Sequence, residues 1–322
     1  MGVLGLNEGN TGRLHKAKAA SIQSFGELDK PSEAVDAIGP AIQLVDGLRE
    51  PLQVPLKFSN RPDMKRIASL TAFFLITACS PVDDTDGFTS LFNGNDLSGW
   101  DGDPALWKVE NGIVVGTCDG PGTMENNSFL IWRGGTVGDF ELRATMRVIG
   151  DNNSGIQYRS RERPDIGEWV ISGYQCDVHP AIEHTGMTYE EKGRGIFGLN
   201  GKSVMLDPQG ERWLIAEHPP VEVDVSEWNE YTVVARGNRS IHTVNGVLSS
   251  ELIDCHESGR SLQGLLAIQL HRGNPNRVEI KDLRIKELPK GDILPFLPGE
   301  AKRIDKPRTS NPQGVGPVLK AN

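Results

Sequence analysis

The sequence predicts an all-β fold in which two antiparallel sheets pack face to face as a jelly-roll sandwich. Glycine and proline are frequent, with 37 and 20 residues among 322, and they separate short apolar runs. Such punctuation is typical of strands joined by turns. The runs alternate apolar and polar residues, the pattern of strands with one buried face. Because no helical segments separate these runs, a parallel sheet with crossover helices is not expected.

The segment 140–148 shows the clearest alternation. Phe140 and every second residue after it are apolar, and the residues between them are polar. This pattern predicts a half-exposed antiparallel strand. Similar alternation predicts further strands at 155–159, 174–179, 231–236, 241–245, 265–271 and 278–286.

Charge and cysteine spacing exclude several kinds of partner. The net charge is −9 and no run of Lys and Arg is dense enough to follow a phosphate backbone, so we expect no nucleic-acid partner. No glycine-rich phosphate loop follows a predicted strand, so we expect no nucleotide cofactor. Cys118, Cys176 and Cys255 are scattered without a CxxC pair, which argues against zinc and predicts no particular disulfide.

The segment 64–79 resembles the signal peptide of a bacterial lipoprotein. Met64 and two basic residues precede an apolar stretch, 67–78, that is too short to span a bilayer as a helix. Small residues then lead to Cys79, as in a lipobox, where the cysteine is diacylated. A buried apolar helix is the alternative, but it does not explain this order of residues. We therefore predict that Cys79 is the lipidation site.

This signal peptide sets the expected organisation of the chain. Ser80 fits sorting to the outer membrane, so we expect an exported lipoprotein, held by its lipid anchor at the outer membrane or facing the periplasm. Translation is expected to begin at Met64, because a signal peptide lies at the start of a chain. The expected segments are an untranslated or disordered upstream segment, 1–63, the signal peptide, 64–78, an acidic tether, 79–87, the β-sandwich, 88–288, and an irregular C-terminal tail, 289–322.

Short motifs follow one another along the predicted sandwich. Each motif alone is weak evidence of a family, whereas this many motifs in this order are strong evidence. They are FTSLFNG at 88–94, LSGW at 97–100, WKVENG at 107–112, DFEL at 139–142, NSGIQYR at 153–159, GYQ at 173–175 with Asp177, TG at 185–186, YEE at 189–191, GRG at 193–195, EWN at 227–229, NG at 245–246, IQLH at 268–271 and the segment 278–283.

In this combination the sequence resembles the 3-keto-disaccharide hydrolase family. The resemblance implies a concanavalin A-like sandwich, in agreement with the strand pattern. It also implies a lyase or hydratase step on 3-keto-glycosides, with a sugar or 3-keto-glycoside as substrate. Many members carry Glu shortly after the tyrosine of the Gly-Tyr motif, where this chain has Gln175 and Cys176. The chain therefore departs from the family at these two positions, and no carboxylate acts there.

The implied chemistry defines the groups to look for. A ketone at C3 of a sugar acidifies the proton on C2, so that the C1 substituent can be eliminated. Such a site needs a general base, an acid for the departing oxygen, and a cation or metal beside the enolate. A divalent metal is possible, but no ligand set is assigned.

Side chains alternate between the two faces of a strand, and this alternation predicts which polar candidates share a face. It places Gln175, Asp177 and His179 on one face of their strand, and it gives similar polar faces to two further segments, 157–159 and 269–271. The glycine-rich loop after Tyr189 is expected to close over these faces. The catalytic candidates are Asp177 or His271 as base and Glu190 as acid; the substrate-binding candidates are Gln157, Arg159, Gln175, Tyr189, Arg194 and Gln269, with Arg159 or Arg194 beside the developing negative charge.

Several candidates have simpler explanations. Asp177 could cap a turn that begins at Pro180. Arg194 could bridge Glu190 four residues earlier. The segment 151–153, Asp-Asn-Asn, could hold calcium through oxygen ligands, although a loop turn explains it as well.

Other functions are also compatible with this fold. A non-catalytic, lectin-like carbohydrate-binding module and a structural domain that docks partners are two of them. A third is a retaining glucanase, because Glu222, Asp224 and Glu227 resemble its paired-carboxylate strand. However, Ser226 stands where that motif has an apolar residue, and Glu227 would face away from the other two.

Overall fold

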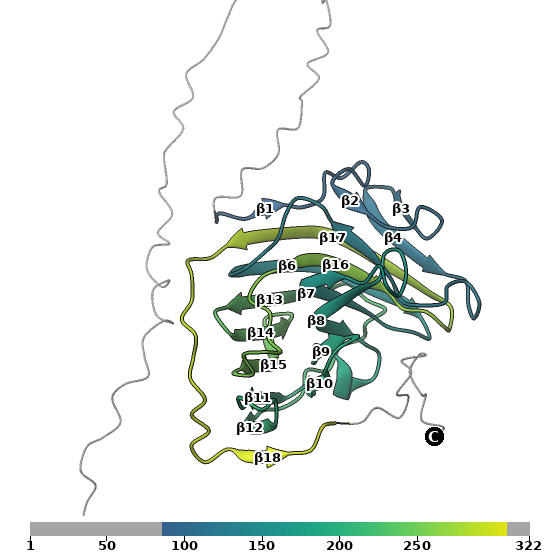
Figure 1. The fold of residues 1–322 in the computed structure, drawn as a ribbon. Coiled ribbons are helices and arrows are strands. Elements are labelled where there is room, and N and C mark those ends of the chain that lie inside the picture. Colours follow the sequence, from purple (N-terminus) through teal and green to yellow (C-terminus); the bar gives the residue numbers. More distant parts are fainter. Residues whose placement is uncertain (1–85, 308–322) are drawn as a thin grey trace, which may run out of the picture. The chain divides into compact units, whose positions relative to one another are not determined.

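The computed structural model describes residues 86–307, which form two β-sheets packed face to face (Figure 1). Apart from one short 3₁₀ helix, η1 (Ile182–His184), every regular element in this range is a strand. The β-sandwich predicted from the sequence is therefore confirmed.

The larger sheet has eleven strands. Its order is β18-β12-β11-β15-β14-β13-β6-β17-β4-β3, and β1 pairs with β17 off this path. The strands are β1 (Thr89–Ser90), β3 (Trp107–Glu110), β4 (Ile113–Cys118), β6 (Phe140–Gly150), β11 (Lys202–Leu206), β12 (Arg212–Glu217), β13 (Asn229–Arg236), β14 (Arg239–Val244), β15 (Val247–Asp254), β17 (Asn276–Glu287) and β18 (Lys302–Ile304).

The smaller sheet has seven strands in the order β10-β9-β8-β7-β16-β5-β2. All of its neighbouring pairs are antiparallel. The strands are β2 (Trp100–Asp101), β5 (Ser128–Trp132), β7 (Ser154–Glu162), β8 (Ile171–Val178), β9 (Thr188–Glu191), β10 (Gly195–Gly198) and β16 (Leu265–Leu270).

One strand pair departs from the predicted antiparallel arrangement. β11 runs parallel to β15. The chain crosses from β10 of the smaller sheet through the short segment 199–201 into β11, so β11 reaches β15 without a hairpin between them. The larger sheet is therefore mixed at this point.

The hydrophobic core lies between the two sheets. Along 140–148, β6 alternates between buried and half-buried residues, as its sequence predicts. The rings of Phe140 and Tyr158 meet edge to face with centroids 6.0 Å apart, and Tyr174 stacks on Tyr158 at 5.5 Å. Since these rings come from both sheets, they join the two layers.

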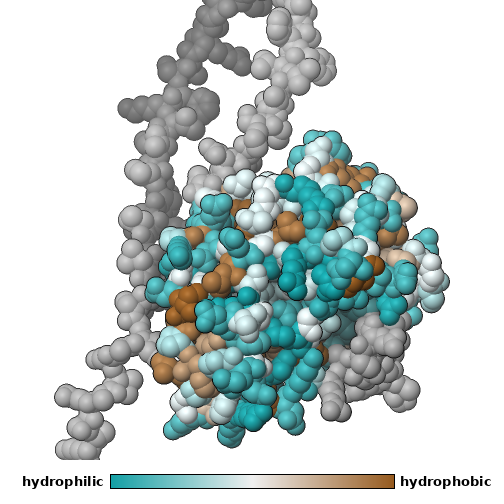
Figure 2. All heavy atoms as spheres, viewed as in Figure 1, coloured by the Kyte–Doolittle hydropathy of each residue, from teal (hydrophilic) through white to brown (hydrophobic). Residues whose placement is uncertain are grey.

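The C-terminal segment is more regular than predicted. It leaves β17, runs along the molecule and adds β18 to the larger sheet beside β12 (Figure 1). Leu294 and Phe296 on the way pack against the cluster of Met205, Ile253 and Cys255, and Phe296 also meets the ring of Trp213. Figure 2 shows apolar residues on the side where this segment runs. Leu297, which belongs to the segment, is 72% exposed. The expected irregular tail is thus corrected between residues 302 and 304, because backbone pairing with β12 orders it.

The three cysteines of the sandwich, Cys118, Cys176 and Cys255, are buried and free. Between residues 86 and 307 no helix is long and apolar enough to cross a membrane. The predicted signal peptide and the lipidation site Cys79 lie outside the described residues.

Candidate active site

Polar side chains gather on the outer face of the smaller sheet. In β8, Tyr174, Cys176 and Val178 belong to the core, so Gln175 and Asp177 between them point to the opposite face. The parity predicted for this strand agrees with the structure. We call this surface the polar sheet face; it comprises Gln157, Gln175, Asp177, His179, Tyr189, Glu191, Gln269 and His271.

A glutamine pair supports Asp177. The side-chain amides of Gln157 and Gln175 are hydrogen-bonded to each other, and Gln175 Nε2 donates to Asp177 Oδ1. Gly155 leaves room for this contact, because a Cβ there would lie 2.5 Å from Gln175 Cδ. Burial, with a smaller contribution from the charge of Glu191, raises the pKa of Asp177 to about 8. This carboxyl is therefore protonated at neutral pH.

His271 follows β16 and is held in one tautomer. Its Nδ1 lies 2.7 Å from the carbonyl oxygen of Arg272, so Nδ1 carries the proton and donates it. The Asn152 side chain donates to the carbonyls of His271 and Arg272 at 3.2 and 3.1 Å and fixes this loop. Burial lowers the pKa of His271 to about 4, so Nε2 keeps its lone pair at neutral pH.

His179 is a second neutral imidazole on the polar sheet face. Its Nδ1 accepts a hydrogen bond of 2.9 Å from the backbone N–H of Ala181. Its ring meets that of His184 edge to face with centroids 4.7 Å apart. Burial, together with His184 and His271, lowers the pKa of His179 to about 3. His179 therefore remains uncharged across the physiological range.

The second carboxyl of the polar sheet face is Glu191. Alternation along β9 turns Tyr189 and Glu191 to the outer face, whereas Glu190 turns inward and binds Arg194. Glu191 is 4% exposed, and burial raises its pKa. Glu190, the predicted acid, therefore lies off the polar sheet face, because a step of one residue along a strand reverses the face. The YEE motif pointed to the right strand, and only the pairing register chose between its glutamates.

Asn127 connects Glu191 to the His271 loop. Its Nδ2 lies 3.4 Å from Glu191 Oε1, and its Oδ1 accepts from the backbone N–H of Arg272 at 3.1 Å. Lys192 Nζ lies 3.9 Å from Glu191 Oε1. Sequence reasoning did not select Asn127, Lys192 or Arg272, since each lies in a loop just outside a strand, where no alternation marks it.

Arg159 does not share the face of Gln157, in contrast to the prediction. The pairing of β7 with β8 shifts register between Tyr158 and Arg161, and Arg159 has a φ of 48°. Its guanidinium instead donates to the carbonyls of Gly138 and Gly237 at 2.9 and 2.7 Å. The bulge reverses parity, which no local sequence pattern indicated.

Arg194 and Gln269 complete the candidates. Arg194 forms an ion pair with Glu190 across a tight turn and lies away from Asp177 on the inward side of β9. Gln269 lies on the polar sheet face and is 1% exposed, and its Oε1 has no hydrogen-bond partner in the structure. A buried amide oxygen without a partner is suited to accept a hydrogen bond from a ligand hydroxyl.

Two other motifs have structural roles. Asn152 donates to loop carbonyls, so the segment 151–153 forms a turn. Within residues 86–307, no three His, Cys, Asp or Glu side chains come together as a metal site.

Glu222 and Asp224 lie outside any strand, and Asp224 caps a turn by accepting from Ser226 N at 2.9 Å. The glucanase motif is therefore not formed.

The described residues form a β-sandwich domain, and a family model defines the class of domain to which it belongs. The family model described as the 3-keto-alpha-glucoside-1,2-lyase-like domain matches residues 87–286, and the chain belongs to that family. The resemblance seen in the sequence motifs is thereby confirmed.

Solved structures with similar sandwiches differ widely in sequence. A candidate glycosyl hydrolase from Parabacteroides distasonis is 22% identical over 63% of this chain and 95% of its own, with a TM-score of 0.43. The carbohydrate-binding module CBM66 from Bacillus subtilis is 14% identical over 59% and 96%, with a TM-score of 0.41. The β-glucanase of Bacillus licheniformis is 11% identical over 63% and 100%, with a TM-score of 0.38. No curated protein matches this chain.

Proposed function

We propose that this domain cleaves 3-keto-glycosides by elimination, with His271 as the general base and Asp177 as the general acid. Family membership supports a sugar substrate. One observation carries the assignment of roles: a single sheet face holds an imidazole that burial keeps neutral and a carboxyl that burial keeps protonated. Pairs of titratable groups whose environments separate their pKa values in this way are typical of acid–base sites.

In the proposed step, loss of the C2 proton leads to departure of the C1 substituent. Nε2 of His271 takes the proton from C2, and the C2–H electrons pass to the C3 carbonyl as an enolate, which then forms the C1–C2 double bond. The C1–O bond breaks, and the departing oxygen takes the proton of Asp177. The products are an unsaturated 3-keto sugar and the free leaving alcohol, and addition of water across the double bond would complete hydrolysis.

Neighbouring groups would assist this step. Lys192 and Arg272 bring positive charge to the loops beside Glu191 and His271, where it would stabilise the enolate. Gln269 Oε1 would accept a hydrogen bond from a sugar hydroxyl.

The surroundings of Asp177 favour an enzyme over a lectin-like module. The polar sheet face brings two carboxyls, two imidazoles and three amides together. Sugar-binding modules instead present aromatic platforms with few titratable groups.

The test is turnover by the full chain. A 3-keto-disaccharide and its unoxidised parent are incubated with and without chelator, and the released sugar is measured. We expect release from the keto compound alone. Asp177→Asn and His271→Ala should each lower kcat by about 100- to 10,000-fold, the usual contribution of a general acid or base.

Glu222→Gln is the matched control. Glu222 is an exposed carboxyl of the unformed glucanase motif, so the variant should keep full activity. Cleavage of the unoxidised parent, with loss in Glu222→Gln, would instead identify a paired-carboxylate glycosidase. Binding of sugar without turnover would identify a carbohydrate-binding module and refute the proposal.

A further inference from the structure

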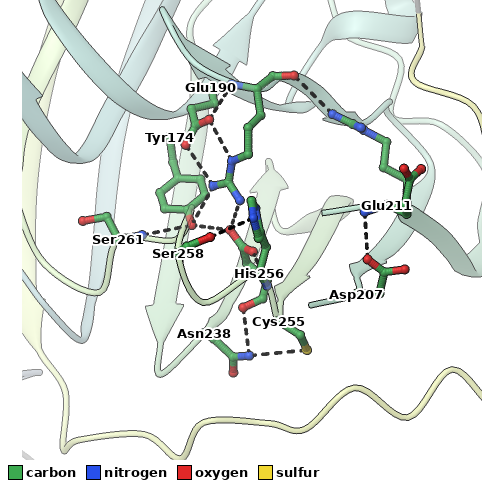
Figure 3. A network of polar contacts seen from close by, with 12 residues as sticks. Tyr174, Glu190, Asp207, Glu211, Asn238, Cys255, His256, Ser258 and Ser261 are labelled. Atoms are coloured by element: carbon green, nitrogen blue, oxygen red, sulfur yellow. Dashed lines mark hydrogen bonds and ion pairs between the residues drawn. The ribbon is translucent and has the colours of Figure 1, made fainter. Parts of the chain in front are cut away.

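A partly buried ionic network closes the turn between β9 and β10 (Figure 3). Arg194 binds Glu190 through two parallel hydrogen bonds, Nε to Oε2 and Nη2 to Oε1, both 2.9 Å long. The backbone N–H of Arg194 also donates to Glu190 Oε2 at 2.5 Å. Such a bidentate pair has a defined geometry, so it sets the shape of this turn.

The same guanidinium reaches the larger sheet. Arg194 Nη1 lies 2.8 Å from Oδ2 of Asp254, which ends β15 and has a side chain that is 3% exposed. Tyr174 OH donates to the same Asp254 oxygen at 2.5 Å and accepts from Arg194 Nη2 at 3.2 Å. The β9–β10 turn, β8 and β15 are therefore joined through one cation.

This network lies directly behind the polar sheet face. Tyr174 pairs with Glu190 in the β8–β9 register, and the next pair along is Gln175 with Tyr189. Because side chains alternate, Tyr174 and Glu190 point inward to the network, whereas Gln175 and Tyr189 point outward. A shift of β9 that relaxed the network would displace Tyr189 and Glu191 by a similar amount.

A second arginine, Arg212 of β12, binds the hairpin at β10. Arg212 Nε donates to the carbonyl of Ile196 at 2.9 Å, and Nη2 donates to the carbonyl of Arg194 at 3.2 Å. The rings of Tyr174 and Phe197 lie 5.6 and 4.7 Å from the Arg194 guanidinium carbon. Buried ion pairs contribute little net stability, but they favour one arrangement over others.

We propose that Arg194 is a positioning residue, whose clamp on Glu190, Tyr174 and Asp254 holds the β9–β10 hairpin so that Glu191 and Tyr189 stay in place beside Asp177. The inference rests on the proposed catalytic face, although Arg194 itself contacts none of the proton-transfer groups. It replaces the sequence-based expectation that Arg194 binds substrate directly.

The test measures the site without requiring turnover. The carboxyl carbons of Asp177 and Glu191 are titrated by ¹³C NMR in the full chain and in Arg194→Met. Loosening β9 would admit water and move Glu191, so the pKa of Asp177 should fall from about 8 toward its ordinary value of 3.8.

If the proposed reaction is also correct, kcat/KM should fall roughly 100-fold, as expected for misplaced groups, and its alkaline limb should move to lower pH. The other charged and titratable groups on or beside the polar sheet face are His179, Tyr189, Glu191, Lys192, His271 and Arg272, and none of them is substituted in this experiment.

Two further variants provide a second test of the clamp and a control for lost stability. Asp254→Asn removes the negative charge that Arg194 Nη1 and Tyr174 OH both contact, and it serves if Arg194→Met fails to fold; it should shift the Asp177 titration in the same direction. Val233→Ala removes fully buried methyl groups in β13, so it lowers Tm while the titration stays unchanged.

The outcomes distinguish a positioning role of Arg194 from a purely structural one. An unchanged Asp177 titration in the clamp variants, with Tm lowered as in Val233→Ala, would show that Arg194 only stabilises the fold. A shifted titration in a chain without keto-sugar turnover would support the clamp and reject the proposed reaction.

Discussion

Asp177 and His271 owe their charge states to the same cause, which is burial. Burial disfavours the charged form, so it raises the pKa of the acid and lowers the pKa of the imidazole. Hydrogen bonds then decide which atoms are available. His271 donates from Nδ1 to a carbonyl, which leaves Nε2 as the basic atom.

These charge states predict a bell-shaped pH profile. The base must be deprotonated, so kcat/KM should rise as pH increases through about 4. The acid must be protonated, so kcat/KM should fall as pH increases through about 8. Steady-state rates on a 3-keto-disaccharide between pH 3 and 10 would check this. A single limb, or an alkaline limb that persists in Asp177→Asn, would contradict the roles assigned here.

Asp177 should also make stability fall with pH. Its folded pKa of about 8 lies above the ordinary 3.8, so the folded state holds a proton that the unfolded state releases. This contribution is complete below pH 3.8 and is lost as pH rises through about 8. Asn cannot ionise, so Asp177→Asn should be more stable than the parent at pH 9, by about 2–5 kcal/mol. Urea unfolding at pH 5, 7 and 9 would measure the difference, and equal pH slopes for both proteins would refute the prediction.

At the scale of elements, strand pairing decides which side chains meet. Alternation along 174–178 was predictable because Tyr174, Cys176 and Val178 are apolar, whereas Gln175 and Asp177 between them are polar. In β9 the sequence TYEE offers two adjacent carboxyls, and only its register against β8 turns Glu191 outward. In β7 a bulge removes Arg159 from the face of Gln157. Local patterns cannot show these choices, because they depend on the partner strand.

The C-terminal segment offers an element-scale test of packing. Phe296 meets the Trp213 ring edge to face with centroids 5.6 Å apart, although the sequence around it has little periodicity. Phe296→Ala should lower the free energy of unfolding by about 1–2 kcal/mol, the value of a partly buried ring. Leu297→Ala is the matched control, because Leu297 is 72% exposed. Chemical denaturation of the two variants would show whether this segment contributes to stability, and equal stabilities would show that it does not.

At the scale of the whole molecule, the sequence by itself determined the sandwich, the family and most of the polar sheet face. Alternating runs and ordered motifs are local, and burial of one strand face follows from them. The tertiary structure alone decided that Glu191 and not Glu190 lies on the polar sheet face, that Arg159 lies off it, that Arg194 binds Glu190 and Asp254, and that burial shifts the pKa values of Asp177 and His271 toward their uncharged forms. These features depend on register, bulges and desolvation, which arise only when distant strands pack together.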